Sequence, residues 1–311
     1  MTTDRPALAP FDASTLAGAV RLPQLGVIRV VGEDAASFLH GQLTQDFSLM
    51  GLSQARLAAF CSAKGRMLAS FVGIKRSHQE IWLVCAQDLL APTLKRLSMF
   101  VLRAKAKLSD ASAEVALYGL VGDGQGWPAS TWAKTDQGEV SLVRLPDAQG
   151  RARALWLAPA GAVPDLPELN PSLWQWLDVH SGVATVSTPV VEAFVPQMLN
   201  YESVDGVNFK KGCYPGQEVV ARSQFRGTLK RRAYLAHAEA PMAVGDNVFH
   251  ASDAEQPTGT VVAVAAHPVA GCDAIVSMQI SSADGGRLTA GAADGPALTL
   301  LPLPYPLRDD I

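Results

Sequence analysis

One stretch of the chain gathers most of the residue types that carry chemistry. Residues 210–218 read Lys-Lys-Gly-Cys-Tyr-Pro-Gly-Gln-Glu. Nearby cations favour a thiolate over a thiol, and Lys211 supplies a fixed cation beside Cys213. Gln217 can donate and accept hydrogen bonds, and Glu218 supplies an anion. The run therefore predicts a reactive thiol at Cys213, and the alternative is a tight Gly-Cys-Tyr-Pro-Gly turn without chemistry.

Basic residues are concentrated around the same thiol. Between positions 210 and 232 the only acidic residue is Glu218. The basic residues there are Lys210, Lys211, Arg222, Arg226, Lys230, Arg231 and Arg232. Such a patch is suited to a polyanion, either a polyglutamylated cofactor tail or RNA phosphates. The alternative is a solvated face at a domain junction.

The four cysteines do not form a recognisable metal motif. They are Cys61, Cys85, Cys213 and Cys272, and no two are spaced as C-x-x-C. We therefore expect no stable zinc or iron–sulfur site within one chain. Cys61 and Cys85 lie in apolar runs, so we expect them to pack as small buried hydrophobes.

Composition limits the class of protein. The chain has 311 residues, enough for two or three structural units, and 48% hydrophobic residues provide for a packed core. The net charge of −3 gives no reason to expect polyanion binding by the whole chain. No apolar run approaches the roughly 18 residues of a membrane span, and the start of the chain, with Asp4 and Arg5 before Pro6, lacks the order of a signal peptide. We expect a cytoplasmic protein with no membrane association.

The patterning of the chain predicts an α+β part followed by a β part. Apolar runs predict strands at 26–31, 57–61, 66–74, 81–86, 114–121, 141–145 and 152–158, and helical spacing predicts helices from 35, over 87–102 and over 173–180. Short β-type runs at 232–237, 259–265 and 274–280 indicate a small barrel or sandwich. The change in texture places a boundary near Gly227.

A longer pattern around Cys213 permits comparison with a known family. It comprises Phe194, Pro196, Gln197, Asn200, Gly206 and Phe209, residues 210–222, then Phe225, Arg226, Gly227, Lys230 and Arg231. Two further runs belong to it, Phe38-Leu39-x-Gly41-Gln42-Leu43-Thr44-x-Asp46 and Leu57-Ala58-Ala59-x-Cys61-x-Ala63-Lys64-Gly65-Arg66-Met67. With Leu301-Pro302-Leu303-Pro304-Tyr305 near the end, the chain resembles the YgfZ family over nearly its whole length, and least at 122–170.

The resemblance implies a fold. The family is similar in fold to the aminomethyltransferase (T-protein) of the glycine cleavage system. It implies an α+β fold in which two intertwined ferredoxin-like units, at about 11–110 and 111–227, surround a central folate pocket. Residues 228–311 are then expected to form a C-terminal antiparallel β-barrel.

The resemblance also implies site residues. A tetrahydrofolate or related folate would be bound by Trp174, Leu25, His180, Gln197, Asn200, Arg222 and Arg226. The key thiol would be Cys213, with Lys211, Tyr214, Gln217 and Glu218 beside it. A family glutamate that grips the pterin ring is matched here by His180, which cannot copy a carboxylate's two-pronged grip. The alternatives are that His180 is an ordinary helix-end histidine and that Trp174 belongs to the core.

Three functions follow from these residues. The preferred one is a folate-dependent accessory protein for iron–sulfur enzymes, with a tRNA methylthiotransferase among its clients and direct tRNA contact as a possibility. The second is a tetrahydrofolate-dependent aminomethyltransferase, but the expected catalytic carboxylates are matched by Ala69 and Ser70, which cannot act as carboxylate bases. The third is an RNA-binding module that uses the basic segment 210–232. We expect a monomer.

Overall fold

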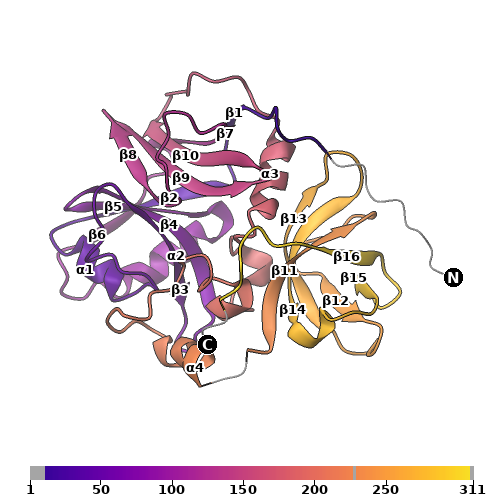
Figure 1. Cartoon of the computed structure of the whole chain (residues 1–311). Coiled ribbons are helices and arrows are strands. Elements are labelled where there is room, and N and C mark those ends of the chain that lie inside the picture. The colour runs from indigo at the N-terminus through magenta and orange to yellow at the C-terminus, as the bar shows by residue number, and fades with distance from the viewer. Residues whose placement is uncertain (1–10, 227–228, 309–311) are drawn as a thin grey trace.

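The computed structural model describes residues 11–226 and 229–308 (Figure 1). Within these ranges the chain forms two five-stranded sheets and a closed barrel. The boundary expected at Gly227 lies outside the described residues. No helix in the described ranges is long and apolar enough to cross a membrane.

The first sheet is antiparallel and has the strand order β3-β4-β5-β2-β6. Its elements are β2 (Leu25–Val31), α1 (Ala35–His40), β3 (Ala55–Cys61), β4 (Met67–Ser77), β5 (Glu80–Ala86), α2 (Gln87–Ser98) and β6 (Lys107–Asp110). Ile28 packs with Phe38 of α1 and Leu90 of α2, whereas its neighbour Val27 belongs to the larger central core. Since successive side chains of a strand point to opposite faces, both faces of this sheet are buried. That double burial explains why its strands are continuous apolar runs.

The second sheet has the order β1-β7-β10-β9-β8. Its strands are β1 (Gly18–Arg21), β7 (Val115–Gly122), β8 (Lys134–Gln137), β9 (Val140–Ala148) and β10 (Arg151–Pro159). β1 precedes the whole first sheet in the chain, yet it pairs with β7. The chain therefore starts in the second sheet, builds the first and returns, so the two units are intertwined as expected.

The C-terminal part is a closed antiparallel barrel, which confirms the expected fold class. Its elements are β11 (Arg231–Ala238), β12 (Asn247–His250), β13 (Gly259–Ala266), β14 (Cys272–Gln279), η3 (Ile280–Ser282), β15 (Leu288–Ala290) and β16 (Ala297–Leu301). The pairing of β16 with β11 closes the barrel. Helix α3 (Pro171–His180) lies between the second sheet and the barrel, and it contacts β1 and β9 on one side and β13 and β14 on the other (Figure 1).

The segment between α3 and the barrel contains three short elements, η1 (Thr188–Val190), η2 (Pro196–Leu199) and α4 (Gln217–Phe225). Helix α4 begins within the thiol run, at Gln217, and was not expected. Helix α2 ends at Ser98 rather than at 102. Met99 and Leu102 are 69% and 86% exposed, so no core face continues beyond Ser98 to hold another turn.

Candidate functional site

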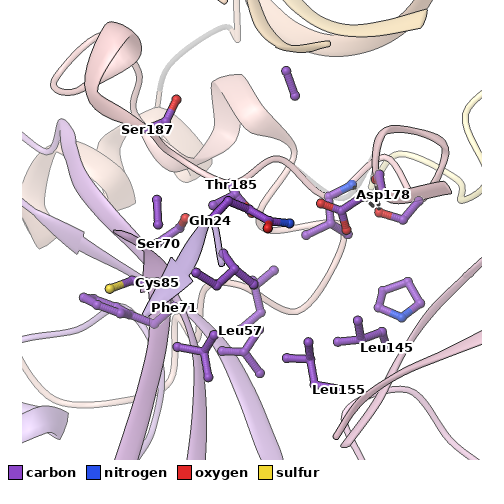
Figure 2. Close-up of a pocket in the computed structure, with 18 of the residues that line it drawn as sticks. Gln24, Leu57, Ser70, Phe71, Cys85, Leu145, Leu155, Asp178, Thr185 and Ser187 are labelled. Atoms are coloured by element: carbon purple, nitrogen blue, oxygen red, sulfur yellow. Dashed lines mark hydrogen bonds between the residues drawn. The ribbon is translucent and has the colours of Figure 1, made fainter. Parts of the chain in front are cut away.

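A cavity of about 630 Å³ lies where the two sheets, α3 and the barrel meet (Figure 2). Leu57 and Ser70 come from the first sheet, Leu155 from the second, Asp178 from α3 and Val262 from the barrel. Most of its wall is apolar, with a few polar side chains among the leucines and valines. Ligand sites in proteins are typically clefts of this size with this lining.

The strongest polar feature of the wall is an ion pair between Arg153 of β10 and Asp178 of α3. The Arg153 side chain is only 1% exposed, and its Nε is buried with no hydrogen-bond partner in the described residues. A buried donor without an acceptor costs about 1–3 kcal/mol. A hydrogen-bond acceptor on a bound molecule would relieve that cost. The Asp178 side chain is 47% exposed, and its carboxylate oxygens can accept hydrogen bonds from the same molecule.

Trp174 lines the cavity wall, and Arg153 covers its ring. A Cβ at Gly119 would lie 2.6 Å from three carbons of the indole, so the indole packs directly on the β7 backbone there. The guanidinium carbon of Arg153 is 4.5 Å from the ring centroid, in cation–π contact. A ligand ring that stacked on Trp174 would have to share this space with Arg153. A folate role for Trp174 stays a prediction.

One face of helix α3 lines the cavity and another faces the barrel, because residues three or four positions apart lie on the same side of a helix. Trp174, Asp178 and Ser181, spaced by four and three, line the cavity. Trp176 and His180, spaced by four, face the barrel instead. His180, assigned to the folate site by the resemblance, therefore lies outside the cavity lining. Two carboxylates line the cavity, Asp178 of α3 and Asp88 of α2. Sequence reasoning missed Asp178, although its spacing from Trp174 could have pointed to it.

The barrel-facing residues of α3 converge on a buried carboxylate. Asp273 of β14 is 1% exposed and accepts from Trp176 Nε1 and pairs with His180 Nε2, both at 2.7 Å, through Oδ2. Its Oδ1 pairs with His237 Nδ1 at 2.7 Å. Burial opposes ionisation of Asp273, but the hydrogen bonds from His180, His237 and Trp176 outweigh it and hold its pKa below the usual value. This contact fastens the pocket helix to the barrel.

The two positions matched to the aminomethyltransferase carboxylates differ in what they face. Ser70 lines the cavity, and its Oγ accepts from the Val186 amide at 2.9 Å. Ala69 points into the core under α1 and α2. Leu25 lines the cavity, and its part in folate binding stays a prediction.

Cys213 is exposed, whereas Cys61, Cys85 and Cys272 are buried. Burial raises the pKa of the Cys61 and Cys85 thiols to about 12, which keeps them protonated at neutral pH. The expectation that Cys61 and Cys85 are buried is confirmed. Among the four cysteines, all of which fall within the described residues, Cys213 alone is open to reagents or partners.

Lys211 differs from the fixed cation expected at its position. Its side chain is buried, and Nζ donates to the carbonyl oxygens of His40 and Leu43, the latter at 2.9 Å. Burial lowers the pKa of Lys211 to about 8, an effect that nearby Asp46 and Cys213 oppose. Its charge is therefore incomplete near pH 8. Nζ also lies 4.6 Å from the ring centroid of buried Tyr214.

Helix α4 is placed by a close backbone approach behind the thiol. Gly216 has φ of 80°, and a Cβ there would lie 2.4 Å from the Ser62 carbonyl oxygen, so only glycine fits. Gln217 begins the helix, and Glu218 is 88% exposed with a loose 3.5 Å contact to Arg222. Such an exposed pair contributes little to stability.

Two predicted cofactor residues serve the structure around α4 and the barrel. Gln197 is fully buried and donates from Nε2 to the Val220 carbonyl of α4 at 2.8 Å. Asn200, also fully buried, donates to the Ala233 carbonyl at 2.8 Å and accepts from its amide at 3.1 Å. Neither lines the cavity, and neither do Arg222 and Arg226, which lie on or next to α4.

The basic patch is smaller than the sequence suggested. Lys211 is buried as described, and Arg232 is buried in an ion pair with Glu202, whose side chain is fully buried. Neither can meet a polyanion without unfolding its surroundings. The exposed members are Lys210, Arg222, Arg226 and Lys230, with Arg231 half-buried.

One hairpin joins the cavity to the thiol loop. Strands β3 and β4 contribute Leu57 and Ser70 to the cavity wall. The turn between them contacts α4, because a Cβ at Gly65 would lie 2.8 Å from Val219. The same hairpin therefore contacts both the cavity and the helix that follows the thiol.

Comparison with known proteins yields consistent similarities. No protein-family model matches the chain. The chain is 30% identical over 253 residues to the tRNA-modifying protein YgfZ of Colwellia psychrerythraea, covering 75% of each chain. It is 29% identical to the protein of the same name from Edwardsiella ictaluri, covering 92% of each. Among solved structures, the glycine cleavage system aminomethyltransferase T of Bartonella henselae matches with a TM-score of 0.64 at 16% identity, over 93% of this chain and 86% of that one, which shows a shared fold.

Proposed function

The chain belongs to the YgfZ family, and from that membership we propose that it is a folate-binding accessory protein for the assembly or repair of iron–sulfur enzymes. Its clients would include enzymes that modify tRNA, a tRNA methylthiotransferase among them. Cys213 is the thiol on which this support depends. The cytoplasm is the proposed location, and a monomer the proposed state.

The cavity supports the folate part of the proposal. Its volume of about 630 Å³ and its apolar wall suit a flat heterocycle with an aromatic extension. Asp178 would accept hydrogen bonds from the amino and ring N–H groups of a pterin, and the unpartnered Arg153 Nε would donate to an acceptor on it. When bound, a tetrahydrofolate would supply one-carbon chemistry. The protein's own contribution is to orient the ring and exclude water.

The proposal depends on one observation: the β3–β4 hairpin lines the cavity with its strands and contacts α4, next to the exposed Cys213, with its turn. A single exposed cysteine per chain suits a transient ligand or adduct better than a stable cluster site. Within the described residues no group of three or more His, Cys, Asp or Glu side chains is arranged to hold a metal ion. We therefore propose that the thiol acts on material carried by a client.

An anaerobic tetrahydrofolate titration, followed by tryptophan fluorescence and calorimetry, tests the folate assignment. Asp178→Asn should weaken binding by about 10-fold or more, since a hydrogen bond to a charged group contributes about 1.5–3 kcal/mol. His180→Gln should change the affinity by less than about twofold, because His180 faces Asp273. Absence of saturable binding by the wild type, or a large loss only in His180→Gln, would contradict the assignment.

A tetrahydrofolate-dependent aminomethyltransferase is the competing proposal, because a protein of that name shares the fold. Position 70 in this cavity carries a serine whose hydroxyl already accepts from the Val186 amide. A glycine-cleavage assay with lipoyl carrier protein separates the two. Robust folate-dependent methylamine transfer would replace our proposal, whereas its absence is expected.

A further inference from the structure

The thiol loop packs against a histidine that is distant in the sequence. His40 ends α1, and its carbonyl oxygen accepts from Lys211 Nζ. A Cβ at Gly212 would lie 3.3 Å from His40 Nε2, so this ring nitrogen faces the residue directly before Cys213. The His40 side chain is 22% exposed, which leaves the ring reachable from solvent beside the exposed thiol.

The other nitrogen of His40 is held by a carboxylate. Nδ1 of His40 lies 3.0 Å from Asp46 Oδ1, and the same oxygen accepts from the Leu49 amide at 2.9 Å. Burial opposes ionisation of Asp46, but the hydrogen bonds from Leu49 and His40 outweigh it and hold its pKa below the usual value. An ionised Asp46 accepts a proton from Nδ1, and in the neutral form of the ring this tautomer leaves Nε2 with its lone pair toward the thiol loop.

We propose that His40 is the general base that activates Cys213, with Asp46 as the residue that orients it. The proton leaves Sγ of Cys213 for Nε2 of His40, which gives a thiolate and an imidazolium. Nδ1–H of that imidazolium stays hydrogen-bonded to Asp46. A nucleophile, a base and an orienting carboxylate form the arrangement by which proteins activate thiols and hydroxyls.

The elements packed around the thiol loop carry charged side chains of both signs. The thiol loop itself carries Lys210 and Lys211, and the packed segment carries His40 and Asp46. The neighbouring elements add the titratable or charged side chains Tyr214, Glu218 and Arg222 behind the loop and Lys64 and Arg66 at the β3–β4 turn. Cys213 is exposed, and His40 Nε2 faces the residue directly before it. Such contacts tighten when a reactant binds.

His40 and Asp46 both lie in the segment 38–46, far in the sequence from the run 210–218 that contains Cys213. Since the inference concerns how Cys213 is ionised, it rests on the proposed role of that thiol. It adds a base that the motif around Cys213 does not supply.

The test is the pH dependence of Cys213 alkylation by iodoacetamide, followed by mass spectrometry of the Cys213 peptide. The three other cysteines are buried and serve as internal unlabelled sites. In His40→Gln the rate at pH 7 should fall by at least about fivefold, while the rate above pH 10, where the thiol ionises without help, should match the wild type. Asp46→Asn should shift the profile in the same direction by a smaller factor. His78→Gln, an exposed histidine in the β4–β5 turn, is the matched control and should follow the wild type.

Each other outcome overturns the inference. Superimposable profiles for His40→Gln and the wild type mean that His40 takes no proton from Cys213. Equal losses at pH 7 and above pH 10 mean that His40 only shapes access to the thiol. Neither result bears on whether Cys213 supports iron–sulfur enzymes, which complementation in cells measures separately.

Discussion

Replacing Asp273 by asparagine removes the charge on which the barrel and the pocket helix converge. Three donors meet its two oxygens, Trp176 Nε1, His180 Nε2 and His237 Nδ1, each at 2.7 Å. An asparagine keeps one acceptor oxygen and turns an NH₂ group toward the remaining donors. Breaking a buried charged contact in this way costs about 3–5 kcal/mol, because the surviving donors stay buried without acceptors.

The assay is equilibrium urea unfolding at pH 7, with thermal melts as a second readout. For a chain of 311 residues, an unfolding entropy of about 2.1 cal/mol/K per residue makes 1 kcal/mol correspond to about 1.5 °C in Tm, so a loss of roughly 5–8 °C is expected. Asp165→Asn, an exposed aspartate, is the matched control and should change stability by less than about 0.5 kcal/mol. A loss below about 1 kcal/mol in Asp273→Asn would refute the reasoning that this carboxylate fastens α3 to the barrel.

The pH dependence of the stability of Asp273→Asn tests whether the pKa of Asp273 is lowered in the folded protein. The pKa of Asp273 is lowered in the folded protein, so its stabilisation is fully present above the ordinary aspartate pKa of about 3.9. It is lost as the pH falls through the lower folded pKa. The stability difference between wild type and Asp273→Asn should therefore shrink as the pH falls below about 4. A difference that grows over that acidic range would contradict the assignment.

Two further predictions concern α4. Gly216→Ala should lower the free energy of unfolding in urea by about 1–3 kcal/mol, since the added Cβ would lie 2.4 Å from a backbone carbonyl oxygen. Gly138, which has φ of 60° but open space around it, is the control. Gly138→Ala should lose only about 1 kcal/mol, from the strained backbone conformation alone. If tRNA is contacted directly, Arg222→Glu with Arg226→Glu should weaken binding and reduce the salt slope by about two, measured by filter binding from 50 to 200 mM salt. No tRNA binding by the wild type at low salt would remove the RNA-binding proposal.

Local pattern was sufficient for strands β2 to β5 of the first sheet and for the thiol motif, but it missed the short strand β6 (Lys107–Asp110). Both faces of that sheet are buried, so the runs around Val27 and Ile28 stand out as apolar without reference to anything distant. The short β-type runs indicated a small barrel or sandwich, and the family resemblance implied the barrel. Its smallest strands, such as β15 (Leu288–Ala290), were missed because three residues give no readable period.

The residues that line the cavity and surround the thiol loop are brought together by contacts between distant parts of the chain. No local sequence pattern encodes those contacts. Position 180 was assigned to the ligand from the resemblance, but helical geometry turns Asp178 toward the cavity and His180 toward Asp273. The contact between Lys211 and the His40 carbonyl spans 171 positions of sequence. Its burial also makes Lys211 a weaker cation than its type suggests, because desolvation penalises the charged form.

The basic segment 210–232 also shows that residue type alone does not reveal which side chains are exposed. Charge counting treated Arg232 as part of a surface patch, whereas it is buried with Glu202 where the connecting segment meets the barrel. Exposure, rather than residue type, decides which charges a polyanion can meet. The exposed positions on α4 are therefore the ones to reverse in an RNA-binding test.

Complementation by Cys213→Ala in a strain that lacks the protein tests the central claim most directly. The variant should fold and bind tetrahydrofolate as the wild type does, since Cys213 is exposed and outside the cavity lining. It should fail to restore iron–sulfur enzyme activity and methylthiolated tRNA when expressed at the wild-type level. Full restoration of both by Cys213→Ala would contradict the account.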